Sequence, residues 1–337
     1  MPQIRDSKYI YAVSRIKTVG NRLLGRDAFD RMVGSATAGE AFKVLVDAHY
    51  GYPGAENLRA RDFEKLLTEE FKKLYGLVRG IAPDPEALDL FLQPYDFHRI
   101  KVILKAEFAG IEDFDGLLSE KGSMDAGRLK TMIQERTFSR MPPAMRRAVE
   151  EALDDFHHTG DMKAVDFIID RACLQSMKEL AESFKHPCLK DYVACMADLR
   201  NMDIFLRLKS GEKRREFLQK ALLPGGYIPL ESFFAEDAAA VRRLVAELRG
   251  TPYGAAAGNA AEAFGKGGSP NWLEDAYHEV TLGFVKRARG RISGLEPLVA
   301  YLLLKEKEIG LVRRIMTGKL SGMSGDRLRE RVGRLYA

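Results

Sequence analysis

Two short segments of the chain look like known ligand-binding motifs, and neither is complete. The segment "HEVTL" begins at His278 like the helix of a zinc protease, but Leu282 stands where the second metal-binding histidine would be needed. The segment "FGKGGSP", Phe264 to Pro270, is similar to a glycine-rich phosphate loop, yet it lacks the GxxxxGK[ST] spacing and follows no predicted strand. We predict neither a zinc site nor a nucleotide site at these positions.

The paired histidines His157 and His158 follow two aspartates and precede Gly160, where a helix is expected to end. Imidazoles in that position usually cap the helix or face water, and a metal-binding or acid–base role is the alternative. The neighbouring pair Glu150 and Glu151 is typical of an exposed helix face. We therefore expect no catalytic residue in this region.

The three cysteines of the chain are Cys173, Cys188 and Cys195. Their spacing matches neither the CxxC pairs of zinc sites nor the disulfide framework of a small secreted domain. His186 could in principle join Cys188 and Cys195 at a metal, but no fourth ligand is apparent. The prediction is reduced, mostly buried thiols, with no metal and no cofactor.

The length and composition indicate two or three domains with ordinary soluble cores rather than a membrane span. The chain has 337 residues, of which 46% are hydrophobic, and its mean hydropathy is negative. Its longest apolar run, Leu298 to Leu304, is far shorter than the roughly 20 residues that cross a bilayer. The N-terminal segment lacks the apolar stretch of a secretory signal. We expect a protein of the cytoplasm, or of the cytoplasmic face of a membrane complex.

Apolar residues recur with the period of an α-helix almost throughout the chain, as in the stretches Tyr9 to Leu24 and Phe63 to Val78. No run of β-branched residues bounded by turns predicts a strand. The small-residue segment from Tyr253 to Pro270 indicates a loop, after which a helix is expected to begin at Trp272. We predict an all-α fold.

One pattern recurs at intervals of about a hundred residues. When Asp96, Asp198 and Glu308 are set equivalent, four apolar positions of the helix that follows coincide in all three copies. Any amphipathic helix carries apolar residues at this spacing, so the four coincident positions by themselves could also arise by chance. A glycine and then a helix-start residue also follow each helix. The three glycines are Gly122, Gly226 and Gly322.

The front of the unit recurs as well. The residues Phe29, Leu45, Tyr50 and Gly51 are matched by Phe233, Leu248, Tyr253 and Gly254. We predict three similar helical units, 1–124, 125–228 and 229–337. Because stacked helical repeats run at roughly 30 to 50 residues, units of this size would each bury a core of their own. They would close about a pseudo-three-fold axis rather than stack as a solenoid.

Three segments of the chain carry a resemblance to a known family: the opening "YIYAVSRIKTVGNRLLGRDAFDRMV", the middle "LRNMDIFLRLKSG" and the ending "AYLLLKEKEIGLVRRIMTGKLSGMSGDRLRERVGRLY". Together they resemble the C subunit of the prokaryotic V-type (A/V-type) rotary ATPase, which is equivalent to the d subunit of the eukaryotic V-ATPase. The similarity runs from about Tyr9 to Tyr336. Where the family commonly has an asparagine, Asn201 keeps it, while Arg99 and Leu311 depart from it.

The resemblance implies a fold of three similar all-helical domains arranged as a funnel. It implies a non-catalytic rotor subunit that sits on the membrane proteolipid ring and receives the foot of the central stalk. Torque would pass through it between the ATPase head and the ion-carrying ring. The partners it implies are the central stalk subunits and the ring, in a hetero-oligomeric complex at the cytoplasmic face of a membrane, with no nucleotide or nucleic acid bound.

The C-terminal end of the chain is basic, with 13 Lys or Arg and 5 Asp or Glu between Lys286 and Arg334. We hypothesise that five of these arginines face an acidic partner surface or acidic lipid head groups. Solvated helix faces, stabilised by the helix dipole, are the alternative. The five are Arg313, Arg314, Arg327, Arg329 and Arg331.

Three other classes of protein compete with this interpretation. A helical enzyme would need a clustered acid, base or metal site, and none is apparent in the sequence. A nucleic-acid-binding protein would interleave aromatic side chains with its basic residues, but Tyr301 is the one aromatic residue between Lys286 and Arg334. A free-standing helical scaffold or adaptor, with the same fold and no ATPase, remains the alternative function.

Overall fold

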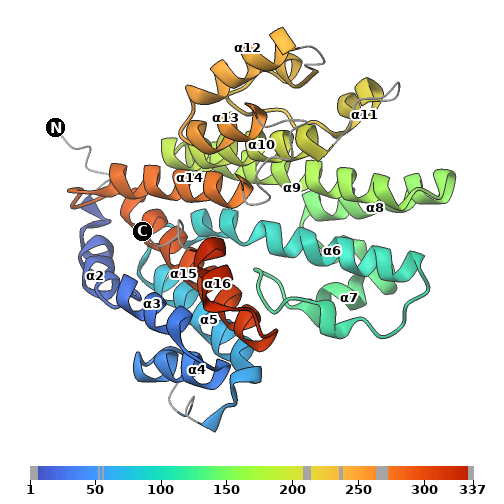
Figure 1. Ribbon diagram of the computed structural model, residues 1–337. Coiled ribbons are helices and arrows are strands. Elements are labelled where there is room, and N and C mark those ends of the chain that lie inside the picture. Colours follow the sequence, from blue (N-terminus) through green and yellow to red (C-terminus); the bar gives the residue numbers. More distant parts are fainter. Residues whose placement is uncertain are drawn as a thin grey trace. The chain divides into compact units, whose positions relative to one another are not determined.

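The computed structural model of the protein describes residues 7–51, 54, 57–207, 214–234, 238–262 and 272–332 (Figure 1). Its regular elements are α-helices and short 3-10 helices, and the described residues include no strand. The prediction of an all-α fold is confirmed. Across these same residues, no helix combines the length and the apolar character that a bilayer crossing requires.

The chain forms two compact units, and the first contains both of its ends. Unit 1 consists of Met1–Pro85 and Ser269–Ala337, and unit 2 consists of Glu86–Gly268. The helices of unit 1 are α2 (Ile10–Gly20), α3 (Arg26–Gly34), α4 (Ala38–Asp47), η2 (Ala60–Asp62), α5 (Phe63–Ile81), α14 (Trp272–Ala288), α15 (Glu296–Leu320) and α16 (Gly325–Val332).

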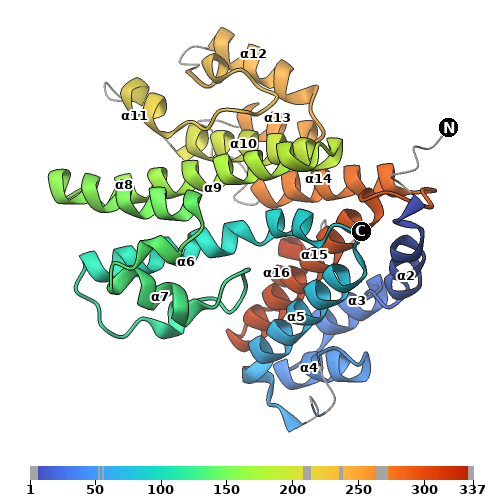
Figure 2. The same cartoon turned by 180° about the vertical axis from the view of Figure 1, so that it is seen from behind.

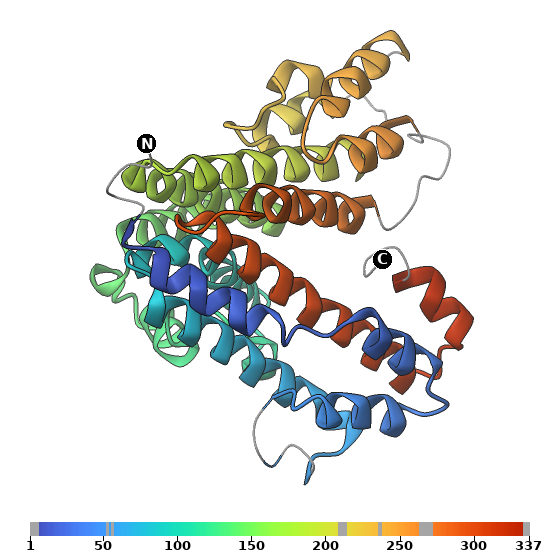
Figure 3. The same cartoon turned by 90° about the vertical axis from the view of Figure 1, so that its left-hand side faces the viewer.

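Helix α15 is the centre of unit 1. It packs against α2, α3, α4, α5, α14 and α16, and Figure 3 shows α2 and α5 lying along it. Its low amphipathicity fits this position, because a helix surrounded by others must be apolar on most of its circumference. Even charged residues of α15, namely Glu296, Lys305 and Glu308, are buried.

Helix α5 forms one side of this core in the way that the sequence predicts. All six residues of its predicted apolar stripe are buried: Phe63, Leu66, Leu67, Phe71, Leu74 and Val78. The predicted helix from Tyr9 to Leu24 is shorter in the structure, since α2 ends at Gly20 and residues 21–25 form a turn. The helix expected at Trp272 begins there, as α14.

Unit 2 is built around the long helix α9, which packs against α6, α8 and α10 (Figure 2). Its helices are η3 (Pro85–Phe91), α6 (Gln93–Phe108), η4 (Asp115–Leu117), α7 (Ala126–Gln134), η5 (Phe138–Arg140), α8 (Pro143–Thr159), α9 (Met162–Phe184), α10 (Pro187–Arg207), α11 (Arg214–Ala221), η6 (Leu230–Phe234), α12 (Ala238–Arg249) and α13 (Gly254–Glu262).

Helices α8 and α9 are joined by a tight turn whose residue types dictate its form. Gly160 ends α8 with φ +67°, a conformation that glycine adopts without steric cost. Asp161 then caps α9, because its carboxylate accepts a hydrogen bond of 2.8 Å from the backbone N–H of Lys163. Asp125 caps α7 in the same way, through the backbone N–H of Arg128.

The prediction of a loop from Tyr253 to Pro270 is wrong for its first part. Residues Gly254–Glu262 form α13, which packs on α12 and α10. Alanine has the highest intrinsic helix propensity, and Ala256 and Ala257 are buried beside the fully buried Tyr253. The rest of the predicted loop, including the phosphate-loop-like segment from Phe264, lies outside the described residues.

Candidate functional site

The three acidic residues that the repeat makes equivalent are all buried. Asp96 lies on α6 and Asp198 on α10, both without solvent exposure, and Glu308 lies on α15 with 4% exposure. A buried carboxylate is costly unless donors surround it, so each of these positions must have specific partners.

In the first copy, the carboxylate of Asp96 fixes the turn that precedes α7. It accepts hydrogen bonds from the backbone N–H of Ser123 at 2.9 Å and of Met124 at 3.3 Å, and from the Ser123 hydroxyl at 2.6 Å. A Cβ added to Gly122 would lie 2.3 Å from the Asp96 Oδ1 atom, and Gly122 has φ +141°. The turn therefore requires glycine at position 122.

In the second copy, Asp198 makes the corresponding contacts. Its carboxylate accepts hydrogen bonds from the backbone N–H groups of Tyr227 at 2.7 Å and Ile228 at 3.3 Å, and from the Tyr253 hydroxyl at 2.5 Å. Burial raises the pKa of Asp198, while these three donors counteract that shift. A Cβ on Gly226 would lie 1.8 Å from the Asp198 Oδ1 atom.

In the third copy, Glu308 belongs to a buried cluster of charges. Lys305 Nζ lies 2.5 Å from Glu308 Oε1 and 2.8 Å from a carboxylate oxygen of Glu70. Burial alone would lower the pKa of Lys305, but the two carboxylates outweigh it and hold that pKa above its usual value. The lysine also lies over the ring of Tyr50, 4.3 Å from its centroid.

Glu70 and Glu308 both bind backbone N–H groups of unit 1. Glu70 accepts a hydrogen bond of 2.8 Å from Gly51, and Glu308 accepts one of 2.6 Å from Leu24. Burial, followed by the negative charges of Glu308 and Glu70, raises the pKa of the Tyr50 phenol. The cluster is therefore a lysine held between two carboxylates that each anchor a turn.

Glu308 has its backbone partner near the start of the chain. The sequence alignment places Gly322 beside Gly122 and Gly226, and in the structure the Glu308 carboxylate binds Leu24. Leu24, Met124 and Ile228 each receive a carboxylate of the repeat, and each lies two residues before a helix. The helices that follow begin at Arg26, Ala126 and Leu230. Glu308, the third carboxylate, therefore binds the connection that precedes α3, near the start of the chain.

In two of the three copies, the side chain three residues after the carboxylate also binds the backbone of the connection. The Asn201 side chain binds both the N–H and the C=O of Leu223, at 2.7 and 2.8 Å. The Arg99 guanidinium, also buried, donates to the carbonyl oxygens of Ser119 and Met124, at 2.6 Å each. Arg99, like Asn201, thus binds backbone carbonyl groups of the connection that follows its helix. At the third equivalent position, Leu311 is apolar and buried.

The five arginines proposed from the sequence lie on two helices and do not share one environment. On α15, Arg313 makes a bidentate ion pair with Glu64 at 2.8 and 3.0 Å, and Arg314 pairs with Glu274. Both pairs lie within unit 1. The other three, Arg327, Arg329 and Arg331, are exposed on α16, where Arg329 contacts Asp326 at 2.9 Å.

The sequence motifs that suggested chemistry have structural explanations. His278 Nδ1 lies 2.5 Å from Lys307 Nζ, and burial together with that ammonium lowers the pKa of His278 to about 4. Burial lowers the pKa of Lys307 to about 8. Near neutral pH the imidazole is thus a neutral acceptor for a charged lysine. Within the described part of the chain, no group of three potential metal ligands occurs.

The structure gives the positions of the remaining candidate residues. His157 and His158 are exposed in the last turn of α8. All three cysteines are buried and none forms a disulfide. Burial raises the pKa of Cys173 to about 12, so its thiol is unreactive at neutral pH.

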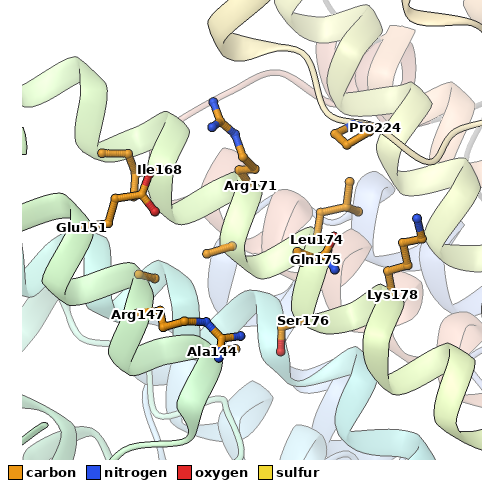
Figure 4. Close-up of a pocket in the computed structure, with 12 residues that line it drawn as sticks. Ala144, Arg147, Glu151, Ile168, Arg171, Leu174, Gln175, Ser176, Lys178 and Pro224 are labelled. Carbon is orange, nitrogen blue, oxygen red and sulfur yellow. The ribbon is translucent and has the colours of Figure 1, made fainter.

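Unit 2 also has an open cleft of about 270 Å³ between α8 and α9 (Figure 4). Its lining includes Ala144, Ala148 and Leu174, and it has Arg147 and Glu151 on one side and Arg171 and Lys178 on the other. Its described lining residues include Ser176 and Glu151 but no histidine or cysteine.

Comparison with known proteins identifies the family of this chain. The family model described as "ATP synthase (C/AC39) subunit" matches residues 12–331. The C subunit of the V-type sodium ATPase of Enterococcus hirae is 25% identical, over 93% of this chain and 94% of its own length. The C subunit of the A-type ATP synthase of Methanocaldococcus jannaschii is 24% identical, over 95% and 85% respectively. The chain belongs to the ATP synthase (C/AC39) subunit family, whose members are the non-catalytic C subunits of A/V-type rotary ATPases.

Proposed function

We propose that this chain is the rotor subunit that couples the central stalk of an A/V-type rotary ATPase to its membrane proteolipid ring. It transmits torque for ion translocation and performs no chemistry itself. Its place is in a hetero-oligomeric complex at the cytoplasmic face of the membrane. Its partners there are the stalk subunits on one side and the ring on the other.

The observation that best supports this role is the set of three buried carboxylates at equivalent positions. Each forms charge-assisted hydrogen bonds with the backbone of a connection, and these are among the stronger hydrogen bonds in proteins. A subunit that transmits torque requires rigid connections between its helices. Glu308 in particular ties the central helix α15 to the segment before α3. We infer that three repeats, 1–124, 125–228 and 229–337, form a stiff body about a pseudo-three-fold axis.

The exposed arginines of α16 are the better candidates for contact with an acidic partner surface or acidic lipid head groups. Arg327, Arg329 and Arg331 present cations to solvent, and opposite charge across an interface sets orientation and association rate. Arg313 and Arg314 already bind Glu64 and Glu274, so their main effect would be to hold α15 against its neighbours.

Purification of the tagged chain from gently solubilised membranes of its native host tests the proposed assembly. We expect an ATPase head, a stalk and a proteolipid ring to co-purify with it, together with ATP hydrolysis activity. Recovery of the chain without any other part of the ATPase would contradict the proposal and favour the free-standing scaffold.

A further inference from the structure

The connection between α14 and α15 is strongly basic and carries an exposed aliphatic side chain. The segment from Val280 to Leu295 contains no acidic residue, and Glu296, which follows it, forms an ion pair with Arg291 at 3.0 Å. We use the term basic tip for the exposed side chains of Lys286, Arg287, Arg289, Arg291 and Ile292. Ile292 is 69% exposed and lies between Gly290 and Gly294, which adopt φ +81° and +96°.

The backbone of the basic tip is ordered by its own hydrogen bonds. The N–H of Arg289 donates to the C=O of Val285 at 3.0 Å, and that of Arg291 donates to the C=O of Ala288 at 3.1 Å. The Arg287 guanidinium lies over the Phe284 ring, 4.3 Å from its centroid. Lys286 and Arg287 thus end α14, and Arg289, Arg291 and Ile292 follow on the short turn that leads to α15.

The start of α2 adds further exposed apolar groups at the same end of unit 1. Gly20, the last residue of α2, lies near Tyr301, and the segment that follows reaches Glu308 through Leu24. The starts of α2 and α15 lie at the same end of unit 1 in all three views (Figures 1, 2 and 3). There Tyr11 is 70% exposed, and Ile10 and Arg15 are exposed as well.

The exposed cations and the exposed apolar side chains at this end of unit 1 are complementary to the surface of an anionic bilayer rather than to that of a protein. Cores of protein interfaces are depleted in charge, whereas here the exposed aliphatic residue follows four exposed cations in the chain. An interfacial membrane site places apolar side chains at the boundary between head groups and acyl chains, and keeps Lys and Arg among the lipid phosphates. Tyrosine favours the same depth, because one end of its ring is apolar and the other polar.

We propose that the basic tip binds the surface of an anionic lipid bilayer, with Ile292 inserted at the head-group boundary and Tyr11 beside it. Its cations contact lipid phosphates. Binding of vesicles requires this chain alone, so it succeeds or fails independently of the coupling function.

The test is flotation of the full-length protein with vesicles of phosphatidylglycerol and phosphatidylcholine in equal parts, against vesicles of phosphatidylcholine alone. We expect partitioning onto the anionic vesicles at low salt and its loss at high salt. Arg289→Ser should reduce the partition coefficient about five-fold, the effect of one cation near such a surface. Ile292→Asn should reduce it about five- to ten-fold.

Matched controls remove the same groups elsewhere. Leu117→Asn changes another exposed aliphatic residue, and Arg243→Ser another exposed cation, both in unit 2. Both should bind vesicles like the unmodified protein, and circular dichroism should report the same fold for all variants. Absence of binding by the unmodified protein would overturn the proposal. Two further results would also overturn it. One is vesicle binding that Arg289→Ser and Ile292→Asn leave unchanged, and the other is that these variants weaken only the association of the chain with acidic proteins.

Discussion

The Glu308 carboxylate accepts a hydrogen bond of 2.6 Å from the backbone N–H of Leu24, across 284 positions of the chain. The same carboxylate holds Lys305, which in turn contacts Glu70. One buried side chain thus joins the central helix α15 to the turn before α3. Because a removed partner would leave buried polar groups unpaired, we expect this contact to stabilise unit 1.

Replacement of Glu308 by alanine should lower the free energy of unfolding by about 3 kcal/mol. The change leaves the Leu24 N–H without its acceptor and reduces the negative charge around Lys305. Chemical denaturation monitored by circular dichroism measures this effect. Glu330→Ala is the control, because Glu330 is exposed, and it should change stability by less than about 0.5 kcal/mol. Equal effects of the two variants would contradict the structural role of Glu308.

The Gly226→Ala variant tests the close approach in the second copy. The added Cβ would lie 1.8 Å from the Asp198 carboxylate, so the turn or the buried acid must move, and we expect a loss of about 3 kcal/mol. Gly76→Ala, in the exposed middle of α5 with open space around it, should instead stabilise the protein by about 0.5–1 kcal/mol. Thermal melts of both variants distinguish the two cases, and a stabilising Gly226→Ala would refute the contact.

The Asn201→Leu variant tests the polar position that follows each carboxylate. It removes both hydrogen bonds to Leu223 and leaves that residue's buried N–H and C=O unpaired, at a cost of about 2–4 kcal/mol. Leu311→Met, at the equivalent apolar position of α15, should cost less than about 1.5 kcal/mol. The denaturation midpoints of the two variants provide the comparison, and similar midpoints would argue against the assignment.

His278 should make stability depend on pH in acid. Its pKa falls from 6.5 to about 4 in the folded protein, so the unfolded chain binds more protons between these values. The contribution of His278 is therefore complete above pH 6.5 and is lost as pH falls toward 4. His278→Gln should flatten the dependence of stability on pH in this window. A slope unchanged from that of the unmodified protein would show that other groups titrate there.

Reversal of the α16 charges should weaken assembly with the ATPase. In Arg327→Glu/Arg331→Glu, two exposed cations become anions that an acidic partner would repel. We expect several-fold less ATPase to co-purify, more so at low salt. The control, Arg242→Glu/Arg243→Glu on α12, makes the same change of charge in unit 2 and should leave recovery unaltered. Equal recovery of the ATPase with both variants would contradict the proposal that the α16 arginines contact a partner.

Helix periodicity was sufficient to predict the fold class and the core of α5, because burial of an amphipathic stripe follows directly from residue spacing. It failed at α13, where small residues of high helix propensity resemble a flexible loop in composition. The acids Asp96, Asp198 and Glu308 could be aligned from sequence. Their burial, and the contact of Glu308 with Leu24 rather than the Gly322 turn, could not be predicted, since a linear comparison does not reveal contacts between chain ends.

The arginine predictions show a second limit of sequence reasoning. Charge counts identified the basic C-terminal region but could not separate Arg313, which binds Glu64, from the exposed Arg327. The partner of Arg313 lies 249 positions away in the chain. The counts also gave no reason to single out Ile292, whose exposure depends on the turn that presents it.

The measurement that tests the coupling function most directly is ATP-driven ion uptake by inverted membrane vesicles from a host strain that lacks this chain, compared with the strain carrying it. The account predicts that without the chain no ion uptake accompanies ATP hydrolysis, although the head still hydrolyses ATP, and that reintroducing the chain restores uptake. Undiminished ATP-driven ion uptake in its absence would contradict the account.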